Sequence, residues 1–303
     1  MSKMSLKHLA YVLLAFFILI SCKSSSDKKS DEFAVPDSVA NRGVLEISDQ
    51  AMKNVTQNIS SHIETAALIK SLNVPFTREH LASTSVDDYN TQFDQALLLG
   101  IYGADLGYLN MYSKTTVALD YLTSIRKLAN SLNVGQFFDF NTLQRLAKNN
   151  ENLDSLMYIS QRNFNQMDRY LRENNRSNLS TLMVAGGWIE GLYLSGKVFE
   201  NRPDPELREA IGEQKIILGD LMILLKNFEQ DPDFAELIEE FERLNSLFKE
   251  VTITIQKGEP KRQVIDGRLV IEQTEKSIVT VSDELLDKII SESIEVRNRI
   301  INQ

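Results

Sequence analysis

Apolar residues recur every three or four positions along most of this chain, the spacing that gathers them on one face of an α-helix. The spacing is clear from Val44 to Asn73, is stopped by Pro75, and returns in successive segments up to residue 251. It returns once more at the C-terminus. The pattern predicts helices over residues 44–73, 85–112, 114–132, 138–149, 151–175, 180–196, 205–228, 232–251 and 283–302.

Helix-start signals support several of these boundaries. Asp204 and Asp231 each precede a proline, which fits an N-cap residue followed by proline at the first helical position. Ser282 is placed to cap the last helix. The run Ser85–Asp88, "SVDD", matches a capping box, and its two aspartates would then be favoured by the helix dipole. This interpretation gives them a structural role rather than a metal-binding one.

The pattern changes after residue 251. "TITIQ", "RQVI", "RLVIE" and "SIVTV" are short β-prone runs, and Asp266–Gly267 between the middle two indicates a two-residue hairpin turn. We expect a β-excursion of two or three strands over about 252–281. The predicted fold class is therefore all-α. It is one domain, residues 44–303, with eight to nine helices and a small β-hairpin insert near the C-terminus.

The first residues have the form of a secretory signal. Lys3 and Lys7 form a basic start, and Leu9–Ser21 is an apolar run too short to span a bilayer comfortably. The run ends in "LISC", which resembles the lipobox of bacterial lipoproteins. The resemblance implies that residues 1–21 are removed and that the thiol of Cys22 carries a diacylglycerol. The alternatives are an ordinary cleaved signal with an accidental cysteine, or an uncleaved anchor.

Residues 22–43 are polar and typical of a flexible tether that follows the lipid. Cys22 is the only cysteine, so no disulfide can form within the chain, and its position fits lipid attachment. The tether resembles those of Bacteroidota lipoproteins, which implies an extracytoplasmic protein anchored to the outer membrane. The run "DSV" also resembles the short O-glycosylation motif of that phylum, which makes Ser38 a candidate for modification.

The chain carries a formal charge of −9 at pH 7. A negative surface repels phosphate backbones, so nucleic acid is not an expected partner. Beyond the signal, no apolar run reaches the roughly 18 residues that indicate a transmembrane helix. The expected partners are the membrane, through the lipid anchor, and an envelope protein or a small ligand. The oligomeric state is left open.

Two segments of the predicted helices, residues 97–112 and 180–196, are apolar nearly all round and rich in glycine. The second of them is expected to begin at a cap, either Ser177 or Ser180. Each glycine inside a helix costs about 0.5–1 kcal/mol relative to alanine, which suggests a compensating role. A stripe without side chains lets two helix backbones approach closely. The candidates for such a helix-packing contact are Gly100, Gly103, Gly107, Gly187 and Gly191.

Each glycine-rich segment, residues 97–112 and 180–196, also holds one acid, Asp105 in the first and Glu190 in the second. A buried carboxylate is unfavourable unless it is hydrogen-bonded or paired. One interpretation is therefore a structural pair with a neighbouring helix. The other is a shared ligand pocket, with Trp188 and Tyr102 as walls and the two acids as polar anchors. For the structural pair, the nominated partners are Arg126, Arg145, Arg169, Arg176, Tyr108 and Tyr193.

Motifs for catalysis or metal binding are scarce. Of the three histidines, only His62 and His80 lie beyond the signal, and neither has the spacing of two metal ligands on one helix face. The chain has no phosphate-binding glycine loop and no Gly-x-Ser-x-Gly elbow. No metal and no cofactor are expected. Asp105 and Glu190 are the only acids we can nominate for a two-carboxylate glycosidase.

"AGGWIEGLYL", "YGADLGYLNMY" and "NLDSLMYI" resemble segments of uncharacterised helical lipoproteins of Bacteroidota, over roughly residues 44–251. The resemblance implies an all-helical extracytoplasmic body, and it implies no activity and no catalytic residue. Our leading hypothesis is a non-enzymatic, membrane-anchored helical protein that binds a partner or acts as a scaffold in the envelope. The alternatives are a carboxylate-dependent hydrolase acting on an envelope or nutrient glycan, and a purely structural envelope component.

Overall fold

The computed structural model describes residues 50–55, 68–148, 153–257, 261–265, 268–272 and 275–302. Every described residue belongs to one compact unit, Gly43–Gln303. Several predictions fall outside the described residues and stay predictions: the signal over 1–21, the tether over 22–43, and the roles of Cys22, Ser38 and His62.

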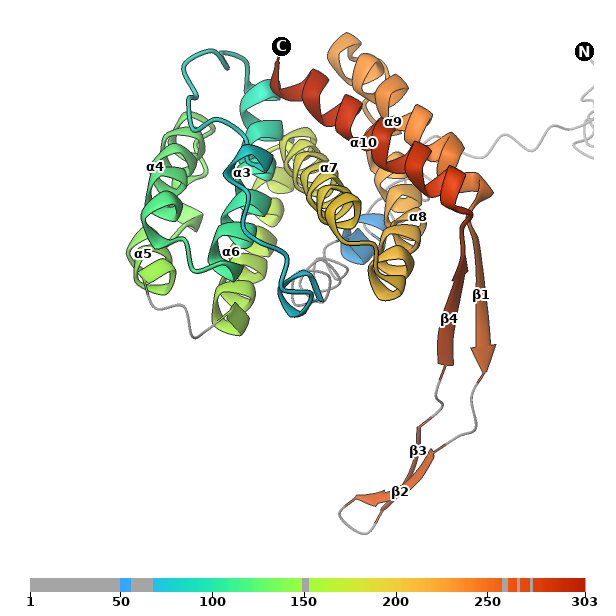
Figure 1. The fold of residues 1–303 in the computed structure, drawn as a ribbon. Helices are drawn as coiled ribbons and strands as arrows, with labels where there is room; N and C mark the ends of the chain where they lie inside the picture. Colours follow the sequence, from blue (N-terminus) through green and yellow to red (C-terminus); the bar gives the residue numbers. More distant parts are fainter. Residues whose placement is uncertain are drawn as a thin grey trace, which may run out of the picture. The chain divides into compact units, whose positions relative to one another are not determined.

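Helices make up most of the described part of the chain (Figure 1). Residues 50–55 and 68–71 are helical, and the later α-helices are α3 (Gln92–Met111), α4 (Thr115–Ser131), α5 (Phe140–Lys148), α6 (Leu153–Glu173), α7 (Ser177–Asn201), α8 (Pro205–Lys226), α9 (Pro232–Glu250) and α10 (Asp283–Ile301). The strands are β1 (Thr252–Lys257), β2 (Lys261–Ile265), β3 (Arg268–Glu272) and β4 (Glu275–Thr280). The prediction of an all-α fold with a small β-insert near the C-terminus is confirmed.

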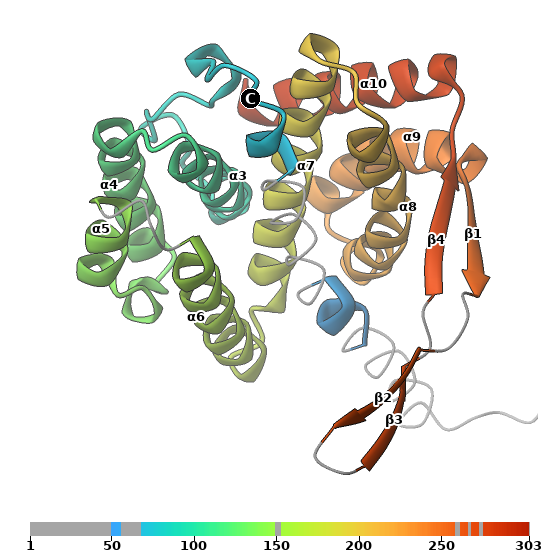
Figure 2. The ribbon, with the colours of Figure 1, turned by 60° about the horizontal axis from the view of Figure 1, so that its bottom comes forward.

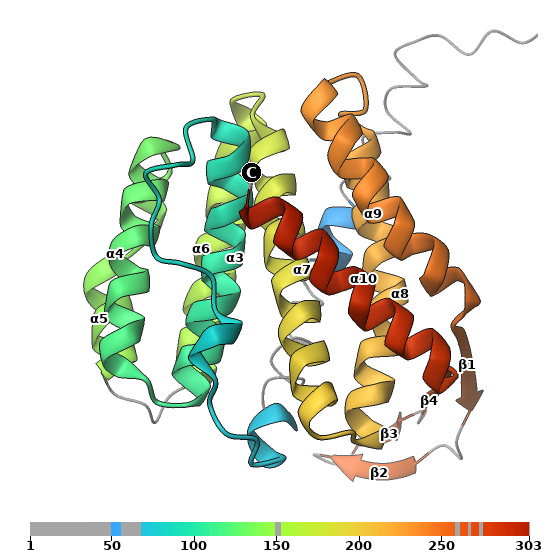
Figure 3. The same cartoon turned by 45° about the horizontal axis from the view of Figure 1, so that its top comes forward.

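Helix α7 is central among the described helices (Figure 3). α3 and α6 pack against it on one side, and α8 and α10 pack against it on the other. Its sequence is apolar nearly all round, which is why it can be buried on all sides. Among the described residues, no helix combines the length and apolarity needed to cross a bilayer. In contrast to α7, helix α9 buries only one face, formed by Phe234, Leu237, Phe241, Leu244 and Phe248.

Side-chain hydrogen bonds confirm three of the predicted helix starts. The carboxylate of Asp204 accepts two first-turn N–H groups of α8, at 2.9 and 3.1 Å. Asp231 accepts one from α9 at 3.0 Å, and the hydroxyl of Ser282 accepts one from α10 at 3.2 Å. The first N–H groups of a helix have no partner within it, so these bonds fix where each helix begins.

Two other predicted starts are wrong. Helix α3 has Thr91 as its N-cap, with its hydroxyl accepting an N–H at 3.0 Å, and the run Ser85–Asp88 precedes it in irregular backbone. Neither proposed serine caps α7, because Ser177 is its first residue, Ser180 lies inside it, and the N-cap is Arg176. The first error has a tertiary cause, since side chains of α3 and α4 bind the backbone just before Val86, as described below.

The β-insert forms two antiparallel ribbons, each of two strands, rather than one sheet of two or three. β1 pairs with β4, and β2 pairs with β3. Ile265 lies opposite Arg268, so two residues join β2 to β3, as predicted for a hairpin at Asp266–Gly267. Those two residues lie outside the described part of the chain.

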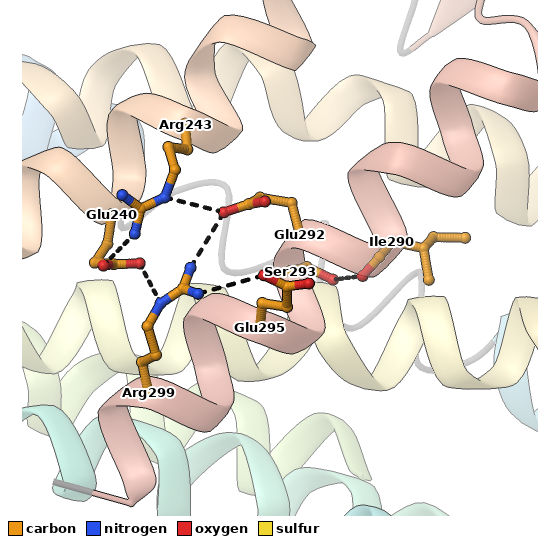
Figure 4. A network of polar contacts seen from close by, with 7 residues as sticks. All are labelled: Glu240, Arg243, Ile290, Glu292, Ser293, Glu295 and Arg299. Carbon is orange, nitrogen blue, oxygen red and sulfur yellow. Dashed lines mark hydrogen bonds and ion pairs between the residues drawn. The ribbon is translucent and has the colours of Figure 1, made fainter.

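An ion-pair network joins α10 to α9 (Figure 4). Arg299 donates to Glu240 at 2.5 Å and to Glu292 at 3.2 Å. Arg243 donates to the same Glu292 at 3.2 Å and also pairs with Glu240. The arginines are partly exposed, so each single bond contributes little, but several shared bonds hold one helix against another. The network joins α9 to α10, which carries Arg297 of the site described next.

Candidate functional site

Helices α3 and α7 cross with almost no space between their backbones. A Cβ added at Gly100 would lie 2.0 Å from the carbonyl oxygen of Met183 and 2.7 Å from the backbone nitrogen of Gly187. One added at Gly186 would lie 2.1 Å from the carbonyl oxygen of Leu97. Close-packed atoms cannot approach so closely, so only glycine permits this crossing. Gly186 escaped the sequence reasoning because it lies outside the Gly-x-x-x-Gly spacing.

The glycine stripe expected on α3 is only partly correct. Gly100 lies at the crossing with Gly187, but Gly103 and Gly107 have no described atom within 4 Å of an added Cβ. Their assignment to the helix contact is therefore wrong, and Gly103 is exposed. Gly191 is partly buried on α7, one turn after the crossing.

Glu190 of α7 forms a two-point ion pair with Arg297 of α10. The Nε of Arg297 donates to Oε2 at 2.8 Å, and Nη2 donates to Oε1 at 3.0 Å. The Glu190 side chain is fully buried and that of Arg297 is 5% exposed. The guanidinium also lies over the ring of Tyr193, 4.4 Å from its centroid. Two parallel charge-assisted bonds of this kind compensate a carboxylate for its loss of water.

Asp105 of α3 is the second buried acid of the site. Its Oδ2 accepts the N–H of Ala82 at 3.1 Å, and its side chain also hydrogen-bonds that of Glu190. Two ionised carboxylates have no proton to share, so this bond requires one of them to be protonated. A proton on Oδ1 of Asp105 also explains why that atom has no donor among the described residues.

The pKa shifts place this proton on Asp105. Burial raises the pKa of Asp105 well above its usual range, and the charge of Glu190 raises it further. Burial raises the pKa of Glu190 too, but the hydrogen bonds and charge of Arg297 oppose that shift. Glu190 is therefore the ionised partner of Arg297, and Asp105 is a neutral acid. The cluster then has balanced charge in the core.

This cluster holds segment 80–85, which begins at the last residue of the 3-10 turn Arg78–His80, against the helices. Arg297 donates to the carbonyl oxygen of His80 at 3.3 Å, and Asp105 accepts the N–H of Ala82. The segment lies in no strand, and buried backbone groups need partners, so side chains supply them. Neighbouring hydroxyl groups donate to four further carbonyl oxygens of the segment: Tyr121 to Ala82, Tyr102 to Ser83 and Ser85, and Ser124 to Thr84.

Trp188 lies apart from this cluster. It is two positions from Glu190, and residues so spaced lie on different faces of a helix. Its Nε1 donates to Gln214 of α8 at 3.1 Å, and its ring packs against Phe241 and Phe248 of α9. The structure therefore groups Asp105, Glu190 and Tyr102 but places Trp188 against the opposite helices.

None of the four pocket candidates is open to solvent in this structure. Asp105, Glu190 and Tyr102 are fully buried, and Trp188 is 2% exposed. Two surface hollows, of about 420 and 340 Å³, lie beside α10 and are lined in part by its acidic side chains. None of the four candidates lines either hollow.

Sequence reasoning missed Arg297, because the run "RNR" near the chain end resembles a solvated helix end. A signal was present, since Arg297 continues the buried stripe of α10 through Ile290, Ser293 and Ile300. Two of the nominated arginines have other contacts: Arg176 donates to the Leu132 carbonyl at 2.9 Å, and Arg126 lies over the ring of Phe140. Tyr193, also nominated, contacts the arginine of the pair.

The arrangement favours a structural role for the acids. The oxygens of Glu190 are occupied by Arg297, and Asp105 binds backbone and the other acid. Within the part of the chain that the structure describes, no group of three or more His, Cys, Asp or Glu could hold a metal ion. No known family model matches the sequence, and no curated protein or solved structure matches it either.

Replacing Asp105 with asparagine tests the protonation of this site. The amide can accept the Ala82 N–H and donate to Glu190, as the neutral acid does. Between the unfolded pKa of an aspartate, about 3.9, and its raised folded-state pKa, the unfolded chain ionises while the folded acid keeps its proton, so wild type loses stability as the pH rises. As the pH rises from 4 to 8, we therefore expect the free energy of unfolding of Asp105→Asn to increase relative to that of wild type. Urea denaturation at each pH measures the difference.

The control is Thr116→Ala on the exposed surface of α4, which removes no titratable group, so its difference from wild type should not change with pH. A difference for Asp105→Asn that stays flat, or that shifts in favour of wild type as pH rises, would show that Asp105 is ionised in the folded protein.

Proposed function

We propose that this chain is a lipoprotein of the bacterial envelope, whose helical body serves as a binding or scaffold unit rather than as an enzyme. The "LISC" sequence supports lipid attachment at Cys22, and the tether-like residues 22–43 support an extracytoplasmic position at the outer membrane. Stable anchoring generally needs more than one acyl chain, which the lipobox resemblance would supply.

One observation carries the non-enzymatic part of the proposal. The only acids nominated for catalysis, Asp105 and Glu190, are fully buried and bonded inside the fold. A general acid or base must come within hydrogen-bond reach of substrate or of an attacking water. Carboxyl groups engaged by Arg297 and by the Ala82 backbone are instead suited to fixing helices α3, α7 and α10 around segment 80–85. A rigid helical body of this kind suits a scaffold.

The anchoring part of the proposal is tested with Cys22→Ala in the full chain, expressed in a bacterium that is fed a clickable palmitate analogue. Wild type should incorporate the label and show the mass of a chain that begins at residue 22. Because the lipoprotein peptidase requires the modified cysteine, Cys22→Ala should lose the label and keep residues 1–21. Mass spectrometry and in-gel fluorescence measure both results.

Ser24→Ala, which lies just past the cleavage point, is the matched control and should behave as wild type. Two outcomes would refute the anchor. A Cys22→Ala chain that is still cleaved and released would indicate an ordinary secretory signal. An unlabelled wild-type chain that keeps residues 1–21 and stays in the membrane would indicate an uncleaved anchor.

A further inference from the structure

The β-insert ends in a ribbon, β2–β3, that lies beyond the part of the insert packed on the helices. Strand β4 contacts α8, where Val279 lies against Gly212 and the hydroxyl of Ser277 hydrogen-bonds Glu213. Among the described elements, β2 and β3 make their extensive contacts with each other. The ribbon that they form lies past the far end of β1 and β4 (Figure 2). A two-stranded ribbon is at best marginally stable in water by itself.

The base of the insert exposes apolar side chains on both faces. Ile255 is 68% exposed and Ile278 is 38% exposed. Ile255 lies opposite Ser277 and Ile278 lies opposite Thr254, so the two isoleucines belong to opposite faces of the ribbon. Each ribbon has two strands, and neither of its edges has a partner among the described strands. Free edges beside exposed apolar residues favour pairing with another chain.

The sequence of β3 identifies a fitting partner for one of these edges. β3 has five residues, from Arg268 to Glu272, with Val270 at its centre. If β3 pairs antiparallel with β3 of a second copy about a two-fold axis at Val270, then Arg268 lies opposite the other copy's Glu272 at both ends. Opposite charges directly across an antiparallel pair are favourable, and Leu269 lies opposite Ile271 between them.

The edge of β2 offers no such match. A two-fold axis at its central residue, Gln263, would place Lys261 opposite Ile265, with no pair of opposite charges. We infer that a second copy of this chain pairs through β3, so that the two ribbons form one four-stranded antiparallel sheet in a closed dimer. This dimer does not depend on the lipid anchor proposed above.

Disulfide trapping tests the register of this sheet in the full chain. Cys22→Ala removes the only native cysteine, and Val270→Cys then adds one on the proposed axis. Directly opposite residues of antiparallel strands have Cα atoms about 4.5–5.5 Å apart, within disulfide range. Mild oxidation in detergent should therefore give a covalent dimer on a non-reducing gel.

Gln263→Cys in the same background is the matched control, because residue 263 lies directly opposite residue 270 on the neighbouring strand. In the proposed sheet its two copies are three strand spacings apart, about 14 Å, and cannot be bridged. Equal trapping at both positions, trapping only at residue 263, or no trapping at residue 270 would each overturn the proposed register.

Charge reversal tests the partner itself. Arg268→Glu and Glu272→Arg, each made in the Val270→Cys chain, place like charges opposite each other in their own dimers and should lower the trapped yield about threefold or more. An equal mixture of the two variants restores opposite charges at both ends, so a mixed dimer should form with near wild-type yield. If the mixture traps no better than either variant alone, β3 does not pair with itself. Mass spectrometry identifies the mixed species.

Discussion

Replacing Arg297 with leucine should lower the free energy of unfolding by about 3–5 kcal/mol, because it leaves the buried Glu190 carboxylate without its partner. The change also removes the donor to the His80 carbonyl and so loosens segment 80–85. Urea denaturation followed by circular dichroism measures the loss. The same change should make segment 80–85 exchange its amide hydrogens faster.

Two further variants separate the pair from the general effect of losing an arginine. Arg299→Leu, on the same helix but with a partly exposed side chain, should cost about 1 kcal/mol or less. Glu190→Leu combined with Arg297→Leu removes both charges and should recover much of the loss, since apolar residues often replace a buried pair at little cost. An Arg297→Leu protein as stable as wild type would refute the structural role of the cluster.

Replacing Gly100 with alanine should destabilise the protein by about 3 kcal/mol, near the upper end for overpacking in a core. The added Cβ would meet the backbone of α7, 2.0 Å from the carbonyl oxygen of Met183, and a helix backbone cannot move aside as a flexible side chain can. The two helices must then separate, which disturbs the Asp105–Glu190 contact between them. Thermal and urea denaturation give the size of the change.

Gly103→Ala, one turn along the same helix, is the matched control. No described atom lies within 4 Å of its added Cβ, and the position is exposed. Alanine is favoured over glycine in a helix interior by about 0.5–1 kcal/mol, so this variant should be slightly more stable than wild type. If both variants were stabilised alike, the close crossing of α3 and α7 at Gly100 would be wrong.

Much of the fold was predictable because its signals are local. Periodic apolar residues predicted the helices, and the Asp-Pro pairs at residues 204 and 231 and Ser282 marked three of their starts. The run Ser85–Asp88 predicted a wrong helix start, because tertiary contacts decide the backbone there. Its capping pattern is equally local, but side chains of α3 and α4 bind the backbone just before it.

The candidate site was only half predictable. Asp105 and Glu190 stood out because each is the one acid within a glycine-rich apolar segment, residues 97–112 and 180–196, and both are buried. Trp188 of α7 also stood out, yet its side chain lies on another face of the helix, where it contacts Gln214 and an aromatic ring of α9. Arg297 did not stand out, because its partner Glu190 lies 107 positions away in the chain and no local pattern links them.

The sequence by itself determined the all-α class, most helix positions and the pairing of β2 with β3, because each depends on spacing and turn chemistry within a few residues. Only the tertiary structure decided which glycines permit the crossing and which arginine neutralises Glu190. It also decided that burial and the charge of Glu190 raise the pKa of Asp105. Those outcomes depend on which side chains meet in the core, where loss of water makes every unpaired charge costly.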